Sequence, residues 1–446
     1  MKEKGGLIID SIKIIDAPCG TGKTSWAIQE MNEHPDRRYI FCTPFLDEIY
    51  RIRKACGFGR VYEPKHQPVR KIDDFHSLLN EGKSIATTHS TFLNTSINET
   101  AELIAKGDYT LILDECIDAV RMYPGTVIDE RGNAYSYGEA DIRLLEENGG
   151  IEVREDGSIH VNEKKLKGTR YEDLIEPAAK EKLYIAEKES LALVYPPDLL
   201  RQFKEVTLLT YMFDGTPMSP YLDSYRLEHH NASVKRDGER FILTGYDEEI
   251  DREFRRSLAG RLHICEKESL NKIGEKSFSL SKNWFEKDKA RRKIVKNALG
   301  NYFSRTLTGA RSRDIMWTTF KAFERDLQGK GYTKIKVKKG TDKRPLIKSE
   351  QDRLNKQRTC FVPCNARASN DYQERWALAY AANIFTPPFY NQFFADKGVA
   401  LDTDAYALNA LIQWLMRSRL RQGLTAELYL PSGRMRGLLE EFLKAF

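Results

Sequence analysis

One stretch near the amino terminus, IIDAPCGTGKT at residues 14–24, constrains the fold of this chain more than any other. A β-branched run, SIKIID, leads into it and a helical pattern, TSWAIQEMNEH, follows it. A strand, a tight loop and a helix N-terminus in this order form a phosphate-binding loop, because the loop N–H groups and the helix dipole then face one anion. Gly20 and Gly22 permit the positive φ angles that such a loop needs. The stretch therefore predicts a nucleotide site in an α/β domain.

The acidic half of such a site is expected at the end of another apolar strand, and YTLILDE at 109–115 supplies it. Lys23 would pair with the β- and γ-phosphates, and the Thr24 hydroxyl and Asp114 would hold Mg²⁺. Glu115 would orient and activate the attacking water. Carboxylates that only cap a strand end are the alternative interpretation. The loop residues expected to bind the nucleotide are Ala17, Pro18, Cys19, Gly20, Thr21, Gly22, Lys23, Thr24 and Ser25.

Strand and helix patterns alternate along the first part of the chain, which predicts a parallel, doubly wound sheet. Residues 122–198 break this rhythm with two hairpin patterns around Gly-bearing turns and a charged, mostly helical stretch at 171–194. Alternation resumes in the second half, with strands expected at 240–246, 314–320, 359–364 and 426–432 and helices at about 284–300, 370–382, 404–421 and 433–445. We therefore expect an α/β fold whose first lobe comprises 1–121 and 199–225, with an α+β insertion at 122–198 and a second, basic lobe at 226–446.

Composition narrows the class of protein. Residues 226–446 carry 43 Lys and Arg against 27 Asp and Glu, a net charge of +16, whereas residues 1–225 carry a net −10. A basic half of this kind favours a polyanionic partner, although it can also serve only solubility. No apolar run reaches membrane-spanning length, so no membrane association is expected. The seven scattered cysteines indicate a reducing compartment, and the charged N-terminus is not typical of a secretory signal.

The segments APCGTGKT and DECI resemble motifs I and II of superfamily 2 helicases, and phage-type replication helicases in particular. Further segments occur in the family's order: CTPF (42–45), ATTHSTF (86–92), LLTYMFDGTPM (208–218), MWTTFKAF (316–323), CNARASNDY (364–372) and QWLMRSRLRQ (413–422). The resemblance covers essentially the whole chain except 122–198. It implies two RecA-like lobes that flank an ATP cleft. One departure is Ile117, which stands where the family has a polar residue that couples motif II to motif III.

The motif VI candidate would supply arginines to the γ-phosphate. Gln413, Arg417 and Arg421 are spaced by four, so on one helix they would share a face, and an arginine there would stabilise charge in the transition state. Met416 replaces the usual Gly of the motif, and the position of the second family arginine is Leu420, which leaves Arg419 and Arg421 as substitutes. The alternative is a cationic helix C-terminus that complements its dipole.

A translocase binds the sugar-phosphate backbone of its nucleic acid through hydroxyls, cations and backbone N–H groups. The residues expected to make such contacts are Thr43, Thr87, Thr88, Thr318, Lys336 and Lys338. The threonines could instead be turn or cap residues. The basic runs at 334–348 and 287–296 could instead be solvated faces.

The sequence thus predicts an ATP-dependent nucleic-acid helicase or translocase that uses ATP and Mg²⁺. DNA, single-stranded or forked, is expected as the partner rather than RNA, together with other replication proteins. The expected location is the cytoplasm of a phage-infected or prophage-carrying bacterial cell. Two alternatives remain open: the ATPase motor of a viral packaging terminase, and a nucleotide-gated nucleic-acid-binding module with weak hydrolysis.

Overall fold

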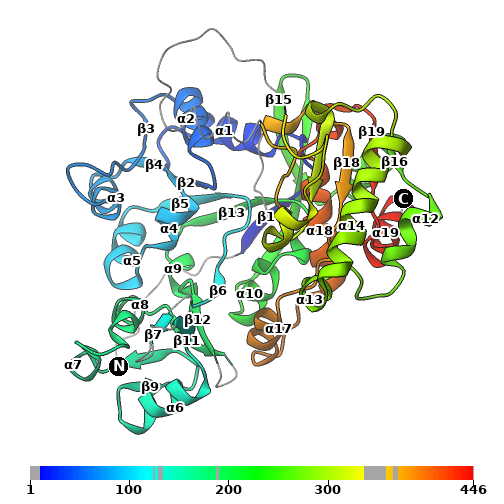
Figure 1. The fold of residues 1–446 in the computed structure, drawn as a ribbon. Coiled ribbons are helices and arrows are strands. Elements are labelled where there is room, and N and C mark those ends of the chain that lie inside the picture. Colours follow the sequence, from blue (N-terminus) through cyan, green and yellow to red (C-terminus); the bar gives the residue numbers. More distant parts are fainter. Residues whose placement is uncertain are drawn as a thin grey trace, which may run out of the picture. The chain divides into compact units, whose positions relative to one another are not determined.

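The computed structural model describes residues 11–123, 126–128, 134–186, 190–335, 358–364 and 370–444. The chain divides into two compact units (Figure 1). The first unit comprises Met1–Ala17, Thr21–Asp247 and Thr386–Asp402, and the second comprises Pro18–Gly20, Glu248–Phe385 and Thr403–Phe446. Each contains a parallel sheet with helices, which confirms the predicted α/β class. Within the described residues, no helix has the length and apolar character of a membrane-crossing segment.

The described part of the first unit is built on an eight-stranded sheet that is parallel except at one edge. Across the sheet the strands are β15 (Arg240–Gly245), β14 (His229–Asp237), β1 (Ile12–Asp16), β13 (Glu205–Thr210), β5 (Tyr109–Asp114), β2 (Arg38–Thr43), β4 (Ser84–Thr88) and β3 (Val61–Tyr62). The helices are α1 (Lys23–Glu33), α2 (Leu46–Cys56), α3 (Lys71–Asn80), α4 (His89–Leu93), α5 (Ile97–Lys106), α9 (Pro197–Leu200) and α10 (Met218–Ser224). Because the central strands are buried, they read in the sequence as continuous apolar runs. Side chains of α1 and α2 pack on one face of the sheet in a shared core.

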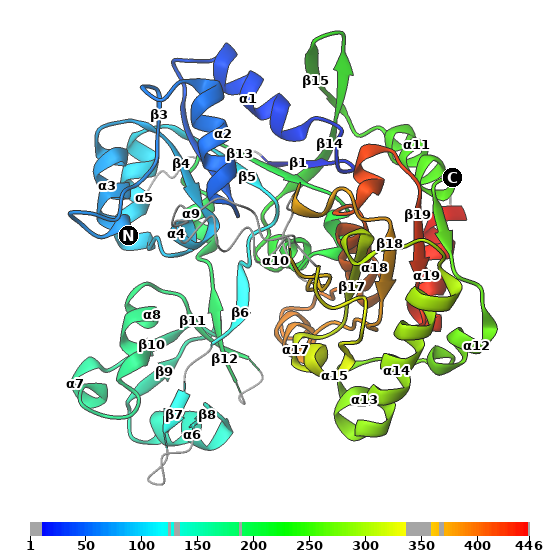
Figure 2. The ribbon, with the colours of Figure 1, turned by 45° about the horizontal axis from the view of Figure 1, so that its top comes forward.

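The insertion between β5 and β13 forms its own subdomain with a local core (Figure 2). Its strands are β6 (Val120–Met122), β7 (Thr126–Ile128), β8 (Ala134–Ser136), β9 (Ile151–Val153), β10 (Ile159–Val161), β11 (Leu183–Ala186) and β12 (Ser190–Val194), and its helices are α6 (Glu139–Glu147), α7 (Glu163–Leu166) and α8 (Ile175–Ala179). The two predicted hairpins are present as β7–β8 and β9–β10. The prediction of a mostly helical stretch at 171–194 is wrong beyond α8. There β11 pairs with β12 and β12 pairs with β6, and most of their apolar side chains are buried.

The first unit extends beyond the boundary that we expected at residue 225. Strand β14 pairs parallel with β1, and β15, which we assigned to the second lobe, folds back on β14 as a hairpin. The segment Thr386–Asp402, with α17 (Pro388–Ala395), also belongs to this unit and packs on α10 and β11. Both differences come from contacts between residues far apart in the sequence, which local patterns do not reveal.

In the described part of the second unit, four strands form a parallel sheet in the order β16 (Leu262–Ile264), β19 (Ala426–Tyr429), β18 (Ala377–Tyr380) and β17 (Ile315–Thr318). The helices are α11 (Glu248–Ala259), α12 (Glu268–Asn271), α13 (Lys282–Lys287), α14 (Lys289–Asn301), α15 (Glu324–Leu327), α18 (Thr403–Leu415) and α19 (Gly433–Lys444). The helix predicted at 370–382 is wrong, because the apolar run there is the fully buried strand β18. The strand predicted at 359–364 makes only isolated bridges, one of them to Trp317.

Candidate nucleotide site

The phosphate loop lies between β1 and α1, and Gly22 is the N-cap of that helix. Gly20 and Gly22 have φ angles of 93° and 97°, in the left-handed region that favours glycine. A Cβ atom on Gly22 would lie 2.1 Å from Cε1 of Phe241, a residue of β15. The Phe241 backbone N–H donates to the Gln29 side chain at 2.9 Å, and the Phe241 carbonyl accepts from it at 3.1 Å. These hydrogen bonds hold the β14–β15 hairpin against α1, and the Phe241 ring packs against the phosphate loop at Gly22.

The structure brings Lys23, Thr24 and Asp114 together at the carboxyl edge of the first sheet. The Lys23 ammonium donates to the carbonyl of Ala17. Asp114 accepts from the Thr24 hydroxyl at 3.4 Å on one carboxylate oxygen and from the Thr43 hydroxyl at 3.3 Å on the other. Strands β2 and β5, which carry Thr43 and Asp114, and β1, which leads into the loop, end at the same edge, where open α/β sheets bind ligands.

The environment of Asp114 is suited to a cation. The pKa of Asp114 is raised to about 7, chiefly by burial and also by the charges of Glu115 and Glu48, while Lys23 and Thr43 act to lower it. Magnesium in nucleotide sites is held by one or two protein oxygens together with phosphates and waters. The Thr24 hydroxyl and the Asp114 carboxylate offer such a donor set, so the residues fit a magnesium–nucleotide complex.

Glu115 adopts a left-handed backbone conformation, with φ at 67°. Its N–H donates to the carbonyl of Leu209 on β13 at 2.9 Å, which holds this turn in place. A non-glycine residue in this region is strained, and such strain often accompanies functional positions. The backbone therefore supports a special role for the residue that follows Asp114.

Two residues that the sequence reasoning missed join the site to the segment 208–218. The Asp16 carboxylate accepts from the N–H groups of Met212 at 2.7 Å and Phe213 at 3.0 Å. The Cys116 sulfur lies 3.5 Å from the hydroxyl oxygens of both Thr210 and Thr216, so its single S–H can donate to either one. Asp16 directly precedes the loop and Cys116 directly follows the acidic pair. These positions next to the two motifs are the sequence feature that could have marked both residues as part of the site.

Ile117, which stands where the family pattern has a polar coupling residue, is an apolar core residue with 2% of its surface exposed. Burial raises the pKa of the Cys116 thiol to about 11, so the thiol stays protonated and can donate. Cys116, next to Ile117 in the chain, contacts the hydroxyls of Thr210 and Thr216 instead.

The predicted strand-contacting threonines are mostly inaccessible. Thr43, Thr87 and Thr318 are fully buried, which removes their side chains from any surface that a strand could touch. Thr88 caps α4 by accepting from the N–H of Thr91. These positions therefore have structural roles in this fold. Lys336, Lys338 and most of the 364–372 segment lie outside the described residues.

Motif VI does not form one helical face. Helix α18, which carries Gln413, ends at Leu415, and a separate 3₁₀ turn begins after Ser418, whose hydroxyl accepts from the N–H of Leu420. Arg417 lies in the break and is 5% exposed, whereas Arg421 is exposed. The Arg419 guanidinium bonds the Thr425 hydroxyl at 3.1 Å and lies over Trp376, which gives it a structural role.

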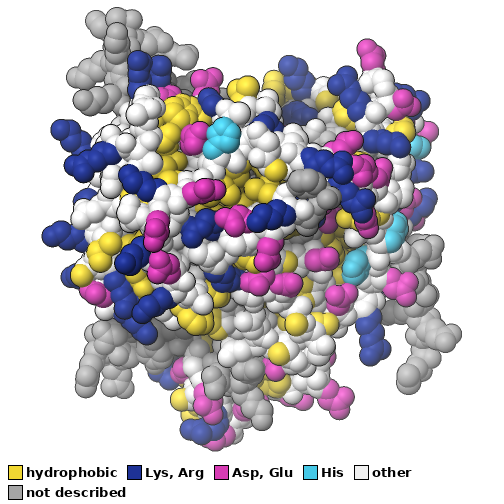
Figure 3. Space-filling model, turned by 90° about the vertical axis from the view of Figure 1, so that its right-hand side faces the viewer, with side chains coloured by type: hydrophobic (Ala, Val, Ile, Leu, Met, Phe, Trp, Pro, Cys, Tyr) yellow, Lys and Arg dark blue, Asp and Glu magenta, His cyan; other side chains and the backbone are white. Residues whose placement is uncertain are grey.

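The basic run 287–296 is partly used in packing. On α14 the Arg291 guanidinium lies over the Trp284 ring, and Arg292 pairs with Asp326 at 2.8 Å. On the face shown in Figure 3, Lys and Arg side chains are interspersed with Asp and Glu. This arrangement is typical of a solvated surface as much as of a nucleic-acid interface.

Comparison with known proteins identifies relatives for the whole chain. Residues 256–443 match a family model described as the YonV C-terminal Rossmann-like domain. The chain is 33% identical over 449 aligned residues to the SPbeta prophage-derived uncharacterized protein YonV of Bacillus subtilis (strain 168), covering 98% of this chain and 99% of that protein. The chain belongs to the YonV family. The family model assigns a Rossmann-like fold to the part that carries β16 to β19, in agreement with its parallel sheet.

Solved structures resemble this YonV-family chain over nearly its full length. A structure described as XPD_APO matches with a TM-score of 0.51 and 12% identity, covering 98% of this chain and 96% of the other. The structure of S. tokodaii Xpd4 matches with a TM-score of 0.49 and 13% identity, covering 97% and 94%. The first likeness shows that this chain shares the fold of the XPD_APO structure.

Proposed function

We propose that this YonV-family protein is an ATP-dependent nucleic-acid helicase or translocase. One observation carries the proposal: Lys23, Thr24 and Asp114 converge at the carboxyl edge of a parallel sheet, with Glu115 adjacent. A phosphate loop and an acidic pair in this arrangement serve ATP hydrolysis. The XPD-type fold supports a helicase among the many ATPases that share these parts.

In the proposed reaction water attacks the γ-phosphate of ATP and releases ADP and phosphate. Lys23 and the loop N–H groups would bind and orient the phosphates, and Thr24 and Asp114 would hold Mg²⁺, which neutralises phosphate charge when bound. Glu115 would accept a hydrogen bond from the attacking water and take its proton. Arg417 and Arg421 remain the proposed γ-phosphate arginines, with Gln413 beside them and Arg419 as the lesser candidate.

The hydrogen bonds of Asp16 and Cys116 support a route by which hydrolysis reaches the segment 208–218. Both residues adjoin catalytic motifs in the chain, and both contact this one segment. A change in the loop or in the acidic pair would therefore be transmitted to it. We propose that this segment couples ATP turnover to movement on the nucleic acid.

We further propose that the protein acts in phage DNA metabolism. The prophage origin of the Bacillus relative supports a place in a phage-infected or prophage-carrying bacterial cell. We propose single-stranded or forked DNA as the partner, with other replication proteins, and contacts from the basic half that includes Lys336 and Lys338. A nucleotide-gated binding module is the second candidate, which the apolar Ile117 favours.

The decisive experiment measures ATP hydrolysis with no nucleic acid and with single-stranded DNA, duplex DNA or RNA. The wild type should be stimulated by DNA, and Lys23→Ala should abolish turnover because it removes the phosphate-binding ammonium. Lys54→Ala, an exposed cation on α2, is the matched control and should behave as wild type. Tight nucleotide binding without hydrolysis would favour the binding module, and turnover indifferent to every nucleic acid would reject the helicase.

A further inference from the structure

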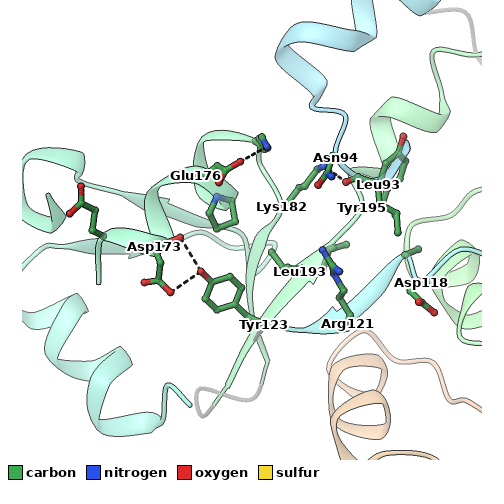
Figure 4. Close-up of a pocket in the computed structure, with 15 residues that line it drawn as sticks. Leu93, Asn94, Asp118, Arg121, Tyr123, Asp173, Glu176, Lys182, Leu193 and Tyr195 are labelled. Carbon is green, nitrogen blue, oxygen red and sulfur yellow. Dashed lines mark hydrogen bonds and ion pairs between the residues drawn. The ribbon is translucent and has the colours of Figure 1, made fainter. Parts of the chain in front are cut away.

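A cavity of about 460 Å³ lies within the first unit, between the insertion and the body of the sheet (Figure 4). Its body wall includes Leu93, Asp118 and Tyr195, and its insertion wall includes Arg121 and Lys182. This volume is in the range of small-molecule sites, about 300–1,000 Å³. The cavity is separate from the phosphate loop and its acidic pair, none of whose residues line it.

Three carboxylates on the insertion side of this cavity already accept hydrogen bonds. Asp173 accepts from the Tyr123 hydroxyl at 3.0 Å, and Glu176 accepts from the Lys180 ammonium at 2.6 Å. Glu172 accepts from the N–H of Gly168 at 3.0 Å. Their charge is therefore partly offset by these donors within the insertion.

Two further cations line the cavity: Lys182 is buried and bonds a backbone carbonyl, and Arg121 has no such partner among the described residues. Lys182 is buried, with 7% of its surface exposed. Its ammonium donates to the carbonyl of Leu93 at 2.5 Å and lies 5.8 Å from the centroid of the Tyr195 ring. Arg121 makes no ion pair or side-chain hydrogen bond with any described residue, and Figure 4 shows it extending from β6 toward the side where Lys182 lies. The pKa of Lys182 is lowered to about 7, chiefly by burial and further by the charges of Lys180 and Arg121, against an opposing effect of Glu176. An anion bound here would relieve this cost.

We propose that this cavity binds one nucleotide unit, with its phosphate on Arg121 and Lys182 and its base against the apolar lining of Leu193 and Tyr123. Charge-assisted hydrogen bonds from these two cations would hold the phosphate. The unit can come from a free nucleotide or from a nucleic-acid strand. The second source rests on the proposed function.

The cavity adjoins the candidate catalytic edge through two short segments. Leu93 ends α4, whose first residue, His89, has its ring nitrogen 2.9 Å from the carbonyl oxygen of Asp114. Asp118, on the same wall as Leu93, lies four residues beyond Asp114 in the chain. A nucleotide in the cavity would therefore contact both segments that hold the main chain of the acidic pair.

The test titrates thymidine monophosphate, and separately a short oligothymidylate, into full-length protein carrying Lys23→Ala, which removes the phosphate loop as a competing site. Arg121→Gln in this background should weaken binding about tenfold or more, because a charge-assisted hydrogen bond is lost. The Arg121 side chain makes no ion pair or hydrogen bond with any described residue, so the Arg121→Gln variant should fold. Lys182→Met is the second variant and should weaken binding similarly. Arg154→Gln, an exposed cation on the same subdomain outside the cavity, is the control and should bind as its parent does.

The outcomes separate the two sources and the two proposals. Weakened binding of the monophosphate supports a free-nucleotide site, and weakened binding of the oligothymidylate alone supports a strand site. Binding of both probes that is unchanged by Arg121→Gln relative to Arg154→Gln, or no binding of either probe, overturns the proposal. ATP hydrolysis that ignores nucleic acid would reject the proposed function, while the monophosphate titration would still decide whether the cavity binds nucleotide.

Discussion

Replacing Gly22 by alanine tests the geometry of the phosphate loop directly. At this position the φ angle is 97°, which an L-residue adopts at a cost of about 1–2 kcal/mol. The new Cβ would also lie 2.1 Å from the Phe241 ring, a clash that real contacts do not tolerate. Relieving such overpacking typically costs a further 1–3 kcal/mol, approximately. The variant should therefore lose roughly 2–5 kcal/mol in the free energy of the loop conformation that binds nucleotide.

The two contributions can be separated in a Phe241→Ala background. There the ring is absent, so Gly22→Ala retains the backbone cost and loses the steric one. The coupling free energy between the two substitutions should be about 1–3 kcal/mol, which corresponds to roughly fivefold to a hundredfold in affinity. Calorimetric titration of the four proteins with a non-hydrolysable ATP analogue and Mg²⁺ measures this term. An equal loss of affinity from Gly22→Ala in both backgrounds would refute the contact between Phe241 and the loop.

Three further substitutions test other parts of the account. Lys182→Met should stabilise the first unit by about 2–3 kcal/mol more near pH 6 than near pH 9, in urea unfolding at both pH values. The pKa of Lys182 is about 7 in the folded protein and 10.5 ordinarily, so burying the charged lysine costs stability fully below about pH 7 and less as the pH rises. A difference in stability between variant and wild type that does not change with pH would contradict this. Asp16→Asn should leave ATP affinity nearly unchanged but reduce stimulation by DNA, because one of the two backbone N–H contacts to the 208–218 segment is lost; equal loss of basal and stimulated turnover would argue against coupling. Glu115→Gln should bind Mg–ATP normally and hydrolyse it about a hundredfold or more slowly in a single-turnover assay, and unchanged chemistry would remove Glu115 from its role.

The sequence predicts those parts of the fold that local patterns encode. Strands β1, β2 and β5 are apolar runs bounded by turn signals, and their carboxyl ends carry the residues that meet in the site. The phosphate loop was predictable because its glycines and lysine lie at fixed offsets between a strand and a helix. Asp114 could be predicted as its partner because strand ends of a parallel sheet share one edge.

The remaining features depend on contacts that no local pattern reports. Asp16 and Met212 lie 196 residues apart in the sequence, so their hydrogen bond could not be predicted from either segment alone. The same holds for β14, whose pairing with β1 moves the boundary of the first unit. Strand β18 was mistaken for a helix because a short, continuously apolar run has no periodicity to distinguish the two.

The central claim is that ATP hydrolysis at Lys23, Asp114 and Glu115 drives movement along nucleic acid. The most direct measurement is the ATP-dependent removal of streptavidin from a biotinylated single-stranded DNA. Two DNAs are compared, one with biotin at the 5′ end and one with biotin at the 3′ end. The wild type should remove it from one end in the presence of Mg–ATP, and Glu115→Gln should not. A wild-type protein that hydrolyses ATP in response to DNA but leaves streptavidin in place at both ends would contradict the claim of a motor.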